Sequence, residues 1–188
     1  MKIQFLTAAI LAGLSFAGFA GDEKINGNFV KTGGPLVSMP DGWTQNKKGA
    51  YASTIKPEFI KDGDGNRIRI RTEDKALTMT SRVFPVKAGD QVDFSIEVQG
   101  KGYLCLHLLT RLEKQDNPED AILSNFSREV SVRSEDLQKH SFTGTISDKD
   151  GRMAKTAALR LIVNPGSDVT IKAITLSVRE PGKNNGTK

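Results

Sequence analysis

"QVDFSIEVQGKGYLCLHLLTRL", residues 91–112, decides the fold of this chain, because apolar and polar residues alternate along most of it. The apolar residues of its first half share one side of an extended segment: Val92, Phe94, Ile96 and Val98. A period of two is typical of a strand with one face in a core and the other in water. Two glycines flank Lys101, so we predict strands over 91–99 and 103–112 joined by a three-residue hairpin loop.

This hairpin register places Gln99 opposite Tyr103 and brings each apolar side chain against another. A slip of one residue would mix the two faces. The opposite surface then gathers polar side chains with one aromatic ring and one imidazole, which makes it a candidate ligand-binding surface. Its members are Asp93, Ser95, Glu97, Gln99, Tyr103, Cys105, His107 and Leu109, with Arg111 just beyond.

Similar short segments recur on both sides of this stretch, separated by turn sequences such as "KDGDGN" and "NPGSD". The expected strands are 50–55, 67–72, 76–80, 128–133, 139–146, 157–163 and 169–178, with one short helical turn at 134–138. About nine strands without long helices indicate an all-β fold. We predict an antiparallel two-sheet β-sandwich of the jelly-roll or Greek-key kind.

The first 20 residues have the pattern of a secretory signal peptide: Lys2, an apolar run, and small residues before Gly21. We therefore expect one domain over 21–180, a disordered tail over 181–188, no membrane span after signal removal, and a secreted or periplasmic location. The net charge of +5 is spread along the chain. Export makes nucleic acid an improbable partner, so the excess of positive charge favours solubility or attraction to acidic polymers.

Metal, cofactor and nucleophile motifs are weak. The two histidines, His107 and His140, stand on different predicted strands without a metal-ligand spacing. "DGDGNRIRIRTE" (62–73) resembles a calcium loop only superficially, because Arg67 stands where the sharp turn needs glycine. Cys105, the single cysteine, lies among apolar residues, where packing is favoured over a nucleophilic role. We expect no metal and no cofactor.

Arg67, Arg69 and Arg71 project from one side of their strand, because Ile68 and Ile70 take the other. Arginine forks bind carboxylates and sulfates at two points. A surface strand kept soluble by its charge is the simpler interpretation and is slightly favoured.

The sequence contains no nucleophile-elbow motif and no phosphate-binding glycine loop. A pair of carboxylates for glycoside cleavage could come from separate strands, with Asp93 and Glu97 as candidates, but any solvated strand offers such residues. We therefore expect a binding protein rather than an enzyme.

Several phrases resemble carbohydrate-binding modules of the family 4 and family 9 type, which share a galactose-binding-like jelly roll: "NGNFV" (26–30), "PDGW" (40–43) and "FPVKAGDQVDFSIEVQGKG" (84–102). The resemblance implies a first strand at "NFV" and non-catalytic sugar binding. Val30 replaces an acidic residue of the family pattern, and "IKAITL" (171–176) lacks its aspartates. The structural calcium of the family is therefore not carried over.

Trp43, the single tryptophan, has two open roles. It could close the sandwich as a packed side chain, or face solvent beside Tyr51 and Tyr103 as a platform for a sugar ring. Packing is favoured, because tryptophan is largely buried in most folds.

These observations predict an exported, non-catalytic domain that binds an oligosaccharide or polysaccharide, with an acidic polymer as the candidate ligand. The predicted ligand-binding residues are Trp43, Tyr51, Arg69, Arg71, Glu97, Gln99, Tyr103, His107 and Arg111. Two alternatives stay open. The sandwich could bind another envelope protein through 113–126, which carries Ile122, Leu123 and Phe126, or it could cleave a polysaccharide.

Overall fold

The structure is a computed structural model that describes residues 25–33, 38–46, 52–112 and 122–180, without the side chains of 122–125. It is an antiparallel all-β fold, as predicted. Its strands are β1 (Trp43–Gln45), β2 (Glu58–Asp62), β3 (Gly65–Arg71), β4 (Leu77–Ser81), β5 (Phe84–Pro85), β6 (Gln91–Leu112), β7 (Ile122–Thr145), β8 (Ala154–Val163) and β9 (Asp168–Arg179). The described residues contain no helix that is long and apolar enough to cross a membrane.

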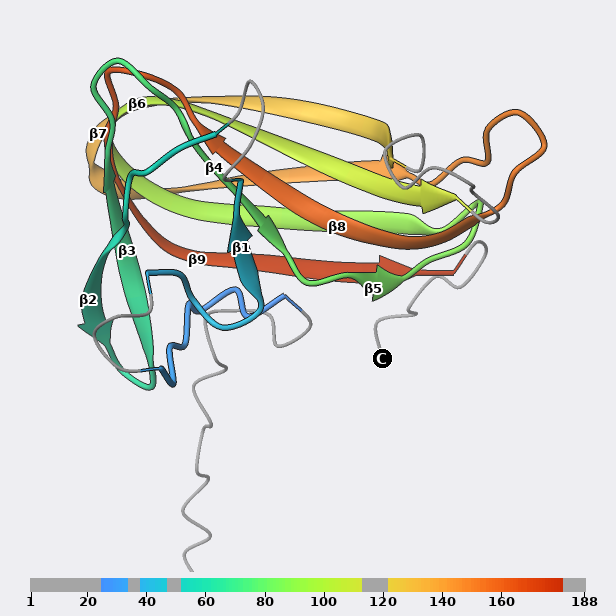
Figure 1. Cartoon of the computed structure of the whole chain (residues 1–188), viewed down its shortest axis with the longest axis horizontal. Coiled ribbons are helices and arrows are strands. Elements are labelled where there is room, and N and C mark those ends of the chain that lie inside the picture. The colour runs from blue at the N-terminus through green and yellow to red at the C-terminus, as the bar shows by residue number, and fades with distance from the viewer. Residues whose placement is uncertain (1–24, 34–37, 47–51, 113–121, 181–188) are drawn as a thin grey trace, which may run out of the picture.

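The predicted hairpin within 91–112 is wrong, because this stretch forms one continuous strand of 22 residues. β6 bends at its middle instead of reversing, and β7 follows it along its whole length. Figure 1 shows both strands turning at the end of the molecule where their labels stand. Each of them therefore contributes one arm to each layer of the sandwich.

The bend depends on glycine at two positions. Gly100 has φ +112° and Gly102 has φ +150°, values that L side chains rarely adopt. A Cβ at Gly100 would lie 2.3 Å from the carbonyl oxygen of Asp168, and one at Gly102 would lie 2.3 Å from Oγ of Ser167. The hairpin was predicted from the same glycines, because glycine can mark either a turn between two strands or a bend within one.

The strand order is β1-β4-β8-β6-β9-β3-β2, with β7 beside β6 and β5 beside β8. The second arm of β6 pairs with β8 and its first arm pairs with β9. We call the half of the sandwich that contains β1, β4 and β8 the β8 layer, and the half that contains β2, β3 and β9 the β9 layer. Because β6 and β7 pass through both, hydrogen bonding joins the two layers into one curled sheet.

The core fills the space between the layers with aliphatic and aromatic side chains. Ile96, Leu106 and Ile174 have no exposed surface. Phe94 and Phe126 stack across the core with ring centroids 5.4 Å apart. The ring of Phe126 lies so close to Gly144 that a Cβ there would overlap it. Burial of this kind contributes roughly 25 cal/mol per Å² of apolar surface and holds the layers together.

Three other local predictions are wrong. Residues 134–138 continue β7 instead of forming a helical turn, and the described part of 50–55 forms no strand. "NFV" (28–30) is the end of a turn and irregular backbone rather than the first strand, and Phe29 packs against Trp43 of β1. Residues 58–62 form a strand that the sequence did not predict, because β2 lacks the alternation of a half-buried strand.

Candidate functional site

The alternation along β6 correctly predicts which of its side chains face the core, even though the predicted hairpin does not form. The even-numbered apolar residues of both arms, such as Val98 and Leu104, point into the core. The odd-numbered residues face away from the core, as predicted, but Ser95 and Leu109 are covered and only 6% exposed. They follow one bent strand, so Glu97 and Cys105 do not stand side by side as the hairpin would have placed them.

The outer surface of the first arm is polar and tightly paired. Ser95 Oγ lies 2.7 Å from Thr175 Oγ1, and Asp93 accepts hydrogen bonds from Thr143 and Arg179, each at 2.6 Å. A shallow hollow of about 320 Å³ runs over these hydroxyl groups. The surface offers hydrogen-bonding groups, and no aromatic ring projects outward from its described residues.

Glu97 and Gln99 lie at the end of this arm that approaches the bend. Glu97 forms an ion pair with Lys172 at 3.4 Å. Gln99 is next to Thr170 of β9, which is next to Arg69 of β3. The structure therefore brings Gln99 and Arg69 onto one outer surface with a threonine between them.

Arg69 and Arg71 both bind Asp168. The Arg69 guanidinium donates to the two carboxylate oxygens at 2.8 and 2.7 Å, and Arg71 Nε lies 3.3 Å from Oδ2. The hydrogen bonds from Arg69, followed by the charges of both arginines, lower the pKa of Asp168. Arg67 Nε donates to Asp62 Oδ2 at 2.9 Å. Carboxylates of the protein itself thus bind the guanidinium groups that could otherwise bind a ligand carboxylate.

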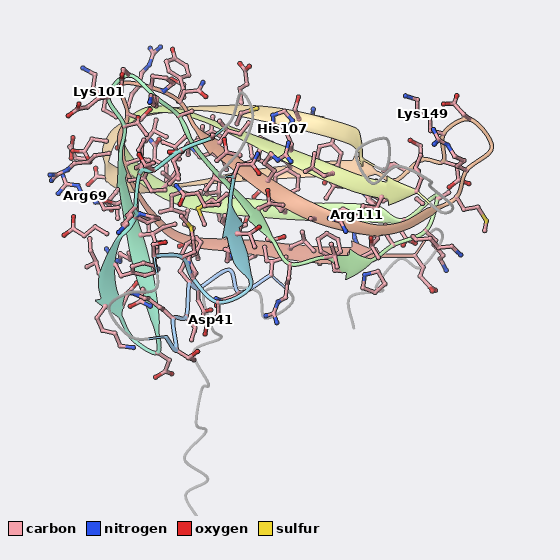
Figure 2. All side chains as sticks on the ribbon, viewed as in Figure 1. Asp41, Arg69, Lys101, His107, Arg111 and Lys149 are labelled. Atoms are coloured by element: carbon pink, nitrogen blue, oxygen red, sulfur yellow. The ribbon has the colours of Figure 1, made fainter. Side chains whose placement is uncertain are left out.

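A pocket of about 610 Å³ lies at the bend of β6. Three segments surround it: the bend, the facing part of β7, and the turn between β8 and β9. The lining residues are Gly100, Lys101, Gly102, Tyr103, Ser131, Val132, Arg133, Glu135, Pro165 and Gly166. Figure 2 shows Lys101 at this end of the molecule, remote from Lys149.

Tyr103 is the aromatic side chain of this pocket, and 49% of its surface is exposed. Its backbone is fixed, because the Tyr103 amide donates to Ser167 Oγ at 3.2 Å. Arg133 Nη2 donates to Tyr103 Oη at 3.4 Å, and Arg133 Nε donates to Ser131 Oγ at 3.1 Å. The hydrogen bond from Arg133 is the main cause that lowers the pKa of Tyr103. The pocket therefore combines an oriented ring with cationic, anionic and hydroxyl groups.

His107 and Arg111 lie further along β6, on the outer surface of the β8 layer (Figure 2). His107 Nε2 is 3.1 Å from Cys105 Sγ. Burial raises the pKa of the Cys105 thiol, with the charge of Glu129 acting in the same direction, and burial lowers the pKa of His107. A protonated thiol beside a neutral imidazole is a poor nucleophile, which agrees with a packing role for Cys105.

Trp43 lies in the core and is 4% exposed. Its ring centroid is 6.0 Å from that of Phe29, and Nε1 donates to the Asn26 carbonyl at 3.2 Å. Trp43 thus takes the packing role, and its burial is incompatible with a solvent-facing platform. Tyr51 lies outside the described residues.

Sequence reasoning missed four members of the pocket: Lys101, Ser131, Arg133 and Glu135. Lys101 was assigned to the predicted hairpin loop and Glu135 to the predicted helical turn at 134–138, and the strand predicted at 128–133 had no assigned partner. The adjacency of Tyr103 and Ser131 follows from the register of β6 and β7. The alternation of residues 128–133 predicts which of their side chains face outward, but it does not predict which strand they pair with.

No group of three or more metal-ligating side chains occurs among the described residues. The "DGDGN" segment forms the tight turn between β2 and β3, in which Asp62 pairs with Gly65. Lys172 lines the small hollow at this turn, which places a positive charge where a cation would bind.

No protein-family model matches this chain, and no curated protein matches it. Among solved structures, a protein described as "CBM4 structure and function" has a TM-score of 0.54 at 16% identity, covering 83% of this chain and 99% of that one. A cyclase from Fischerella sp. TAU has a TM-score of 0.54 at 11% identity, covering 77% and 87%. The enzymatically active domain of tailspike protein 4 from bacteriophage CBA120 has a TM-score of 0.56 at 11% identity, covering 81% of this chain and 21% of that one. This chain shares the β-sandwich fold of carbohydrate-binding modules and of these cyclases.

Proposed function

We propose that this chain is a non-catalytic carbohydrate-binding module and that its sugar site is the pocket at the bend of β6. The observation that carries the proposal is the exposed ring of Tyr103 in a pocket with Arg133, Lys101 and Glu135. An aromatic face packs on the C–H groups of a pyranose, while nearby charged and hydroxyl groups bind its oxygens. The fold alone does not choose between binding and catalysis, because a carbohydrate-binding module and a cyclase both share it.

The ligand class that we propose is an acidic saccharide. Lys101 and Arg133 outnumber Glu135 in the pocket, so the site carries a net positive charge. A guanidinium holds a carboxylate or sulfate through two parallel hydrogen bonds. Arg69 and Arg71 contribute charge near the bend but have Asp168 as their partner. We also propose that the protein is exported, on the basis of its first 20 residues.

Calorimetric titration against a panel of neutral, uronate-containing and sulfated oligosaccharides tests this proposal. We expect the acidic members to bind more tightly, and their affinity to fall as salt screens the pocket. A reducing-sugar assay on the same panel is expected to stay flat. The absence of binding by the folded protein would overturn the proposal, and the appearance of new reducing ends would overturn its non-catalytic part.

Two pairs of variants locate the site. Tyr103→Ala is expected to weaken binding roughly tenfold, or about 1.4 kcal/mol, while Tyr103→Phe retains most of the affinity because it keeps the ring. Lys101→Ala is expected to weaken the acidic ligands selectively. Lys149→Ala, which removes the same charge at the remote end of the molecule, is expected to leave affinity unchanged. Equal losses from the two lysine variants would mean that the site lies elsewhere.

A further inference from the structure

The outer surface of the β8 layer brings a thiol and an imidazole together outside the pocket at the bend. Cys105 Sγ lies 3.1 Å from His107 Nε2, and both side chains are half-buried. Neither residue lines the pocket. The chain contains one cysteine and two histidines in all, so this pair holds its single thiol and one of its two imidazoles.

Both donors stand on a part of β6 that has a strand on each side. Residues two apart on a strand project from the same face, and Leu106 between them has no exposed surface. β6 is paired here with β7 on one side and with β8 on the other. The backbone therefore fixes the spacing of the two side chains before any ion binds, which lowers the entropic cost of binding.

One metal ion can reach both donor atoms from these positions. Metal–sulfur and metal–nitrogen bonds of about 2.3 and about 2.0 Å span a 3.1 Å separation at an angle of about 90°. Rotation of the half-buried imidazole about its side-chain bonds widens this angle without moving the backbone. The short distance between Sγ and Nε2 shows that the two donor atoms already point toward each other.

The donor set identifies the kind of ion. No group of three or more metal-ligating side chains occurs in the part of the chain that the structure describes, so the protein supplies two donors here. Structural zinc is held by a complete tetrahedron of ligands, and calcium by a shell of oxygens. A thiolate is a soft ligand that selects Cu(I), and this ion is stable with two ligands.

The charges around the two donors balance. In the register of the sheet, Cys105 pairs with Glu129 of β7, and His107 pairs with Arg160 of β8. One acidic and one basic side chain therefore flank the donors, and the thiolate that forms on binding neutralises a univalent cation. A divalent ion would leave an excess positive charge at a half-buried position, which is unfavourable.

We propose that Cys105 and His107 form a binding site for one Cu(I) ion on the outer surface of the β8 layer. The thiol releases its proton to solvent as the thiolate sulfur and the Nε2 lone pair each bind the ion, and no electron is transferred. The site is separate from the sugar pocket and does not rest on the proposed function. Failure to bind saccharides and failure to bind copper are therefore distinguishable outcomes.

Anaerobic titration of the purified chain with Cu(I), held in solution by excess chloride, tests the site through its ultraviolet thiolate-to-copper absorption. The absorption is expected to rise to a plateau at one equivalent of copper. Zn²⁺ at the same concentrations is expected not to bind, because two donors leave its tetrahedral coordination incomplete. The absence of a copper plateau, or zinc binding as tight as copper binding, would overturn the proposal.

Variants identify the two donors. Cys105→Ser is expected to abolish the absorption. His107→Gln is expected to weaken copper binding at least about tenfold, because losing a ligand costs at least as much as losing its supporting hydrogen bond. His140→Gln is the matched control, because it removes the other imidazole, which lies on β7 opposite Ile96. It is expected to leave the copper affinity unchanged.

Thermal melting checks that each variant is folded, and Cys105→Ala replaces Cys105→Ser if the serine variant is not. Copper binding that the cysteine variant retains would place the ion elsewhere. Equal affinities of the wild type and His107→Gln would reduce the site to a thiol alone, and equal losses from the two histidine variants would show a general effect on the fold. Each of these results would overturn the two-donor site.

Discussion

The bend of β6 and its two straight arms follow different rules. In the arms, alternation alone decides which side chains are buried, and the even-numbered residues of both arms enter the same core. At the bend, Gly100 and Gly102 have backbone angles reserved for glycine and touch the β8–β9 connection. The structure of the arms thus depends on burying apolar side chains, so substitution of one apolar residue by another is tolerated there. The structure of the bend depends on glycine, because any larger side chain would collide with the neighbouring chain. The candidate site lies at the bend because the close approach of the two glycines to the β8–β9 connection brings β6, β7 and that connection around one pocket.

The largest expected effect comes from filling the bend. Gly100→Ala adds a methyl group that would lie 2.3 Å from a backbone oxygen, at φ +112°. Backbone strain and overpacking together should destabilise the fold by roughly 3 to 6 kcal/mol. Chemical denaturation measures this loss.

Gly151→Ala is the control for the bend. Gly151 also has a positive φ, +72°, but nothing lies within 4 Å of an added Cβ. Its cost should be only about 1 kcal/mol. Equal costs for the two variants would show that the close approach at Gly100 contributes nothing.

The arms should show a strong difference between neighbouring residues. Leu106 has no exposed surface, and Leu106→Ala should cost about 2 to 5 kcal/mol through lost burial and a cavity. His107 points outward on the same strand, and His107→Ala should cost less than about 1 kcal/mol. The comparison uses the same denaturation measurement. Similar losses would contradict the assignment of inner and outer faces.

The smallest expected effect concerns Asp168, the carboxylate that holds Arg69 and Arg71 beside the bend. Its pKa in the folded state lies below the ordinary value of an aspartate. The stability that Asp168 contributes to the fold is therefore complete above its pKa in the unfolded state. It is lost as the pH falls through its pKa in the folded state. Asp168→Asn should lower the melting temperature slightly at neutral pH and flatten its fall below about pH 4. The same acid dependence in wild type and variant would contradict a stabilising role for these ion pairs.

Much of the fold could be predicted from the sequence because its signal is local. Period-two alternation located the strands β3, β4, β8 and β9 and both arms of β6. It also sorted Tyr103, Cys105 and His107 onto the outer surface. β2 was missed because its two apolar residues, Phe59 and Ile60, are adjacent and so lie on opposite sides of the strand. Trp43 could be assigned to the core only as the favoured of two roles.

The candidate site could be predicted only in part. Tyr103 was named from its position on a polar face. Its neighbour Arg133 ends a predicted strand whose partner the sequence did not identify, and Glu135 falls in the predicted helical turn at 134–138. Arg69 and Arg71 were predicted to bind a ligand because a guanidinium group can hold a carboxylate. In the structure that carboxylate is Asp168, 99 residues away from Arg69. Contacts between residues so distant in the chain leave no local pattern.

The sequence by itself determined that this chain forms antiparallel strands with a defined inner and outer face, because alternation of apolar and polar residues is a property of neighbours. Only the tertiary structure decided whether 91–112 reverses or bends. Two glycines permit either path, and the choice depends on which distant strands hydrogen-bond to each arm. That choice brought Tyr103, Lys101 and Arg133 together at the bend and left β7 as the open edge.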